Sequence, residues 1–144
     1  MFGLAKALLP AISVAVVFWA TSVVSAQPSG IACIKEMTVP VYGGVIWQAQ
    51  VTGTARVEIS LNPNGSPANV TATTDPYPVL GKWLESWFRK ASFLPSCGAG
   101  PVVLKLIYKL DGAPQAAPDN RIVVRGPDTF EITAHPPQPH VNVN

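Results

Sequence analysis

The sequence predicts an α+β fold in which one amphipathic helix packs on one face of a small antiparallel sheet. Three observations carry this prediction. Residues 56–61 alternate polar and apolar side chains, as in a half-buried strand, and the tight-turn pair Asn64-Gly65 follows them. From Pro78 the apolar residues recur at helical spacing. Val102–Leu110 then alternates again, so the order of hairpin, helix and strand favours a helix lying on a sheet.

The two arms of the predicted hairpin differ in strength. Residues 68–74 form the weaker second arm, and Asp75-Pro-Tyr-Pro78 ends it because proline cannot donate to a ladder. Pro78 suits the first position of the helix. The apolar stripe of that helix, which we expect to face the core, contains Leu80, Trp83, Leu84, Trp87, Phe88 and Ala91.

Residues 1–26 have the composition of a targeting segment. Lys6 is their only charged residue, an uncharged apolar run covers residues 7–24, and Val24-Ser25-Ala26 supplies small residues before Gln27. We expect export with cleavage at this point. An uncleaved anchor is the alternative, because about 18 apolar residues can just span a bilayer.

The rest of the chain divides by composition. We expect a short entry segment over residues 27–37, a domain over residues 38–112 and a proline-rich tail over residues 113–144. The tail begins with a flexible linker at 113–118 and carries two short strand-like runs, Arg121–Arg125 and Thr129–Ala134, that fit a small hairpin. The final residues are expected to be disordered.

Export decides how the two cysteines are interpreted. Cys33 and Cys97 mature in an oxidising compartment if the chain is exported, and two thiols there usually pair. A nucleophilic Cys97 is the competing interpretation and needs a histidine base. The two histidines, His135 and His140, both lie in the proline-rich tail, so we expect that Cys97 has no histidine base and that the protein is not an enzyme.

The charge balance excludes strongly electrostatic partners. Without Lys6, nine Lys and Arg residues face eight Asp and Glu residues. We therefore expect no nucleic-acid partner. No paired carboxylates, phosphate-binding glycine loop or zinc-type spacing is present, so no metal or cofactor is expected.

A set of short motifs resembles the C-terminal domain of TonB in its order and spacing. The resemblance covers roughly residues 38–112, and no single motif in it is specific. The family's Gln-Pro-x-Tyr-Pro is here Val39-Pro40-Val41-Tyr42-Gly43. The matching motifs, in order, are Pro40-Val-Tyr42, Gly53, Asn64-Gly65, Phe93-Leu-Pro95 and Asp111-Gly112.

The resemblance implies a periplasmic protein-binding domain. TonB docks an outer-membrane receptor, whose short box adds as a strand to an edge of the sheet, so that main-chain bonds give affinity and alternate side chains give specificity. Here the expected edge is Val102–Leu110, beside the flanking segment at residues 39–42. The expected partner-binding residues are Pro40, Val41, Tyr42, Val103, Lys105, Ile107 and Lys109.

Two functions follow as hypotheses. In the first, the chain recognises an extended segment of an outer-membrane or envelope protein by strand addition, with a link to TonB-dependent transport. In the second, Arg121–Arg125 or Thr129–Ala134 occupies the open edge and the chain is a structural or dimerising envelope protein. An inner-membrane motor becomes a partner only if residues 7–24 stay as an anchor facing the periplasm.

Overall fold

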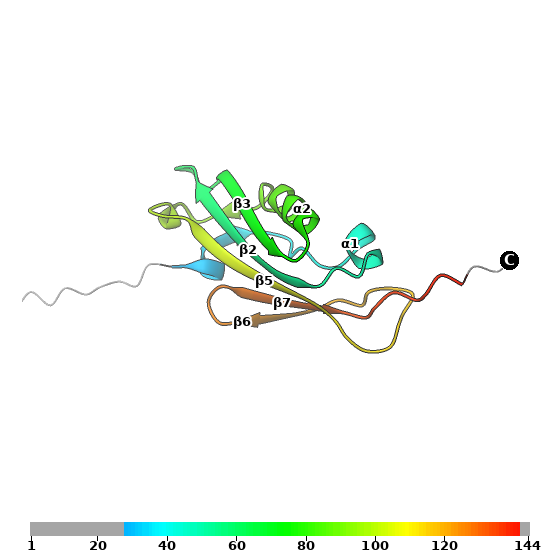
Figure 1. Ribbon diagram of the computed structural model, residues 1–144. Helices are drawn as coiled ribbons and strands as arrows, with labels where there is room; N and C mark the ends of the chain where they lie inside the picture. The colour runs from blue at the N-terminus through cyan, green and yellow to red at the C-terminus, as the bar shows by residue number, and fades with distance from the viewer. Residues whose placement is uncertain (1–27, 142–144) are drawn as a thin grey trace, which may run out of the picture.

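The computed structural model describes residues 28–141, which form an α+β fold (Figure 1). The targeting segment predicted at 1–26 and the end of the tail at 142–144 lie outside the described residues. The main sheet has five strands in the order β3-β2-β5-β7-β6. They are β2 (Gly53–Leu61), β3 (Pro67–Asp75), β5 (Val102–Leu110), β6 (Arg121–Arg125) and β7 (Thr129–Ala134).

The smaller elements lie around this sheet. A two-stranded sheet pairs β1 (Ile34–Glu36) with β4 (Ser92–Phe93). The α-helices are α1 (Gly44–Gln48) and α2 (Pro78–Phe88), and the 3-10 turns are η1 (Gly30–Cys33) and η2 (Pro95–Cys97). In Figure 1 both α-helices lie on the same face of the main sheet.

The α+β class is confirmed, but the predicted sheet was too small. A purely antiparallel sheet of a hairpin and one further strand was expected, with a single helix. The structure has a mixed five-stranded sheet and two α-helices, because β6 and β7 join the sheet and β7 pairs with β5 in parallel. The tail is thus part of the domain's sheet.

The hairpin of β2 and β3 turns at Asn64-Gly65. The Asn62 and Gly65 N–H groups donate to the carbonyls of Ser66 and Asn62 at 2.8 and 2.9 Å, and Gly65 has φ +87°. A Cβ at Gly65 would lie 2.1 Å from the carbonyl oxygen of Phe93, so both the backbone angle and the space require glycine. The turn therefore also fixes the chain where it leaves α2.

Helix α2 packs mainly against β3 and buries Leu80, Leu84 and Phe88. The two tryptophans of the predicted apolar stripe, Trp83 and Trp87, are only half-buried, with ring centroids 5.2 Å apart. The Trp87 indole N–H donates to the carbonyl of Thr38 at 2.7 Å. Trp83 therefore borders the core, and Trp87 holds the chain at Thr38.

Cys33 and Cys97 form the predicted disulfide, across 64 positions of sequence. It joins η1 to η2, and the Leu94 N–H donates to the Cys33 carbonyl at 2.8 Å beside it. The disulfide therefore ties the entry segment to the chain that follows α2.

The tail is attached to the domain at several points. The Asn120 side chain accepts from the Tyr42 N–H at 2.9 Å and donates to the Tyr42 carbonyl at 2.8 Å. The Trp47 indole donates to the His135 carbonyl at 2.7 Å, and the His135 N–H donates to the Pro118 carbonyl at 2.9 Å. The expected linker also contributes the Gln115 N–H, which donates to the Pro136 carbonyl at 2.9 Å, so this segment makes specific backbone contacts with the chain after β7.

Candidate functional site

The edges of the sheet, and the segment that flanks the expected edge, are the places where a partner strand could bind. The predicted flanking contact is largely internal, because Pro40 and Tyr42 are buried and Val41 is half-buried. The rings of Tyr42 and Tyr108 meet edge to face with centroids 5.3 Å apart, and the Tyr108 hydroxyl donates to the Pro40 carbonyl at 2.7 Å. Burial raises the pKa of both tyrosines above its usual value, so both stay neutral donors.

Strand β5, the expected open edge, lies inside the sheet. It pairs with β2 on one side, and its residues from Lys105 to Leu110 pair with β7 on the other. The expectation of an open edge along Val102–Leu110 is therefore wrong, because the apolar side of β7, with Phe130, Ile132 and Ala134, is buried beside β5. The predicted contacts Lys105, Ile107 and Lys109 point to the face of the sheet opposite the buried core, hereafter the open face.

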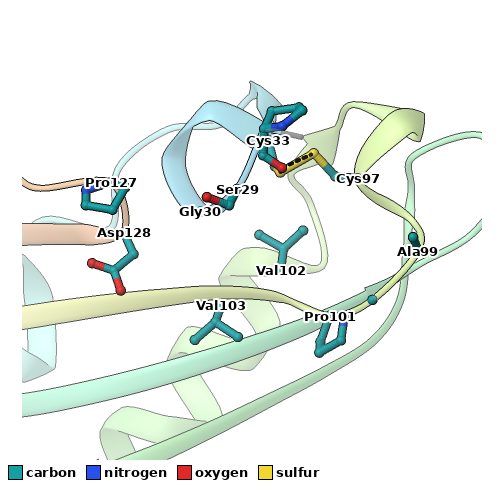
Figure 2. Close-up of a pocket in the computed structure, with 12 residues that line it drawn as sticks. Ser29, Gly30, Cys33, Cys97, Ala99, Pro101, Val102, Val103, Pro127 and Asp128 are labelled. Atoms are coloured by element: carbon teal, nitrogen blue, oxygen red, sulfur yellow. Dashed lines mark hydrogen bonds between the residues drawn. A yellow bond between two sulfur atoms is a disulfide. The ribbon is translucent and has the colours of Figure 1, made fainter. Parts of the chain in front are cut away.

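Val103 of β5 directs its backbone groups toward β7 but is not paired with it. The Lys105 N–H donates to the Asp128 carbonyl at 2.8 Å, which shows that odd-numbered residues of β5 direct their backbone groups toward β7. Val103 therefore faces the same way, but the pairing with β7 starts only at Lys105. Val103 instead lines a pocket of about 410 Å³ beside the disulfide, and Ser29 and Asp128 line the same pocket (Figure 2).

The outer edge of β3 is closed at its centre by α2. The Ala72 N–H donates to the Glu85 carboxylate of α2 at 3.2 Å. A Cβ on Gly81 of α2 would lie 3.2 Å from the Ala72 carbonyl oxygen, so the helix backbone itself passes close to this edge. A partner strand at β3 would have to displace the helix.

Strand β6 is the other outer strand of the sheet, and its backbone directions follow from the pairings around it. The Asp111 N–H donates to the Ala134 carbonyl at 2.9 Å, so even-numbered residues of β7 direct their backbone groups toward β5 and odd-numbered ones toward β6. Across the β6/β7 pair, Val123 is opposite Glu131, whereas Ile122 is opposite Ile132. Ile122 and Val124 thus direct their N–H and C=O groups away from the sheet.

The side chains at this edge are unusually apolar for exposed positions. Ile122 is 43% exposed and Val124 is 56% exposed, on the same side of the sheet as the core. Arg121, Val123 and Arg125 alternate with them and lie on the open face. Among the described residues none is hydrogen-bonded to the outward backbone groups of Ile122 and Val124.

Positive charge dominates the open face near β6. The strand residues of β5, β6 and β7 on this face include four cations, Lys105, Lys109, Arg121 and Arg125, and one carboxylate, Glu131. The Arg125 Nε lies 2.7 Å from the Glu131 carboxylate and the Lys109 Nζ lies 3.6 Å from it. The hydrogen bond from Arg125 lowers the pKa of Glu131 despite its partial desolvation, so this carboxylate stays ionised and its charge is already balanced by Arg125.

Residues 28–141 contain neither a cluster of metal ligands nor a helix that could span a membrane. No three His, Cys, Asp or Glu side chains of this part gather as metal ligands would. Its helices are too short or too polar to cross a membrane.

Comparison with known proteins gives no relative, since no family model, curated protein or solved structure matches the chain.

The edge at β6 was not expected from the sequence, because its run Arg-Ile-Val-Val-Arg is short and its position in the sheet is set by distant residues. The second hypothesis already allowed Thr129–Ala134 to occupy the β5 edge, and once β7 lies there, its hairpin partner β6 becomes the outer strand.

Proposed function

We propose that the chain is an exported protein-binding module that captures an extended segment of an envelope partner by strand addition at β6. One observation carries this proposal. Ile122 and Val124 present both unpaired backbone groups and exposed apolar side chains at the same edge. An added strand would satisfy the first and cover the second.

The energetics favour a weak, reversible complex. Two residues with outward N–H and C=O groups allow about four main-chain hydrogen bonds, each worth roughly 0.5–1.5 kcal/mol net. Covering Ile122 and Val124 adds a hydrophobic contribution, but association and ordering of the peptide oppose it. We expect dissociation constants in the range of roughly 10 µM to 1 mM for an isolated peptide.

The relation to TonB remains part of this proposal. The chain has a hairpin, then a helix, then β5 beside β2, in the order of the motifs that suggested the resemblance. The proposal moves the site from β5, where the resemblance placed it, to β6. Export to the periplasm is supported by the disulfide, because such bonds persist in oxidising compartments.

A structural or dimerising role is the second candidate function, and the pairing of β7 with β5 favours it. In that case the tail hairpin closes the sheet and β6 needs no ligand. Analytical ultracentrifugation of the oxidised protein separates a dimer formed by the chain itself from a monomer that binds peptides.

The experiment that tests the proposal selects peptides from a random seven-residue display library on the oxidised protein. Val124→Pro removes an outward N–H without removing a hydrogen bond to β7, as proline is tolerated on edge strands. Val124→Ala is its matched control, because it keeps the N–H and removes only the side chain. We expect selected peptides to bind Val124→Ala a few-fold less tightly and Val124→Pro at least tenfold less tightly.

Equal binding of the peptides to all three proteins would place the site elsewhere. A selection that enriches no peptide above the background would also overturn the proposal. Circular dichroism and thermal unfolding check that each variant keeps the fold.

A further inference from the structure

We infer that the strand accepted by β6 carries an acidic residue at each end of a three-residue apolar run. This inference rests on the proposed strand addition at β6 and names the chemistry of its partner. A residue of an added strand lies on the same face as the β6 residue opposite it. The five β6 positions therefore specify the five positions of the partner.

The two arginines at the ends of β6 favour negatively charged residues opposite them. Arg121 and Arg125 lie on the open face, four positions apart. Arg125 shares Glu131 with Lys109, and Arg121 has no ion-pair partner among the described residues. A carboxylate opposite each arginine would offset the surplus of cations on this face.

The three middle positions of β6 favour apolar side chains opposite them. Ile122 and Val124 are exposed on the core side, and Val123 is half-buried between the two arginines on the open face. Apolar residues opposite all three would extend both faces of the sheet by one strand. The resulting pattern, acidic-apolar-apolar-apolar-acidic, reads the same in both directions, so it holds for a parallel or an antiparallel partner.

A second copy of this chain does not fit the pattern. Full pairing of two β6 strands places Arg121 opposite Arg125 in the antiparallel direction and each arginine opposite itself in the parallel direction. Like charges directly opposite in a sheet are destabilising. The edge is thus guarded against self-association while it remains open to an acidic partner.

A hollow of about 450 Å³ lies on the open face beside β6. It is bordered by two cations, Arg121 and Lys109, and by two carboxylates, Asp111 and Glu131. Lys109 already lies 3.6 Å from Glu131, whereas Arg121 has no ion-pair partner among the described residues. Arg121 is therefore the residue expected to contribute most to the preference for acid.

The test compares three synthetic peptides with the same apolar centre, each flanked by Ser-Gly for solubility. Their cores are Glu-Val-Val-Val-Glu, Gln-Val-Val-Val-Gln and Lys-Val-Val-Val-Lys. Binding is followed by the amide resonances of Ile122 and Val124 in ¹⁵N-labelled protein. We expect the glutamine peptide to bind roughly three- to tenfold more weakly than the glutamate peptide, since exposed ion pairs contribute little each. The lysine peptide should bind more weakly still.

Charge reversal in the protein completes the test. Arg121→Glu should reduce the ratio of glutamate-peptide to lysine-peptide affinity at least threefold. Arg89→Glu is the matched control: it makes the same change of charge at an exposed position just after α2 and should leave the ratio unchanged. High salt should also reduce the wild-type ratio, because the charges are exposed.

The outcomes separate this inference from the proposed function. Equal binding of the three peptides at β6 would overturn the acidic pattern and leave strand addition standing. A failure of all three peptides to shift the resonances of Ile122 and Val124 at millimolar concentration would overturn both.

Discussion

Removal of the Ile132 side chain tests whether the tail hairpin is part of the core. Ile132 is fully buried in β7, opposite Tyr108 of β5 on one side and Ile122 of β6 on the other. Replacing a fully buried isoleucine by alanine costs about 2–5 kcal/mol, through lost burial and the cavity that remains. We expect Ile132→Ala to destabilise the oxidised protein by about 3 kcal/mol.

The matched control is the isoleucine directly opposite in the next strand. Ile122 is 43% exposed, so Ile122→Ala removes the same atoms from a position that is already partly solvated, and it should cost less than about 1 kcal/mol. Urea unfolding followed by tryptophan fluorescence measures both. With an m-value of about 1.5 kcal/mol/M, the midpoint should fall by roughly 2 M for Ile132→Ala and by well under 1 M for Ile122→Ala.

Equal midpoints for the two variants would refute this reasoning. They would mean that β7 leaves the sheet in solution, so that neither isoleucine is buried there and the β5 edge is open after all.

Three further predictions concern the contacts that hold the domain together. Replacing Cys33 and Cys97 together by serine should destabilise the chain by about 4 kcal/mol on the loop-entropy model, measured by urea unfolding; a loss below about 1 kcal/mol would contradict a disulfide that restrains the unfolded chain across 64 positions. Asn120→Ala should cost about 1–3 kcal/mol, because both of its hydrogen bonds are to the Tyr42 backbone, and Asn120→Asp, which keeps only the acceptor, should fall between alanine and wild type. Burial raises the pKa of Tyr108, so the neutral side chain contributes fully to the free energy of unfolding below the unfolded pKa of about 10, and this contribution is lost progressively as pH rises above that value. The free energy of unfolding should therefore fall between pH 9 and 11. An equally steep fall in Tyr108→Phe would show that ionisation of Tyr108 is not the cause.

The local elements of the fold were predictable because their signals are local. The hairpin turn at Asn64-Gly65, the start of α2 at Pro78 and the alternation of β5 each depend on a few neighbouring residues. The pairing of Cys33 with Cys97 was also predictable, since a chain with two cysteines leaves one intramolecular combination.

The sequence raised a tail strand at the β5 edge as an alternative, but its parallel direction was not predictable from those signals. The alternation in β7 shows that it is a strand, but not that it lies parallel to β5, because that depends on which apolar surface is left uncovered after β2, β3 and α2 have packed. The role expected for Tyr42 shows the same limit. The resemblance to TonB implied that Tyr42 contacts a partner, whereas its ring is buried against Tyr108, 66 positions away.

Amide hydrogen exchange along β5 and β6 of the oxidised protein tests the central claim most directly. The pairings predict protected amides at Lys105, Ile107 and Lys109, which donate toward β7, and rapid exchange at Ile122 and Val124, with protection at Val123 between them. Rapid exchange at Lys105, Ile107 and Lys109 would contradict the account, because it would show that the edge of β5 is open and that β6 is not the edge of this sheet.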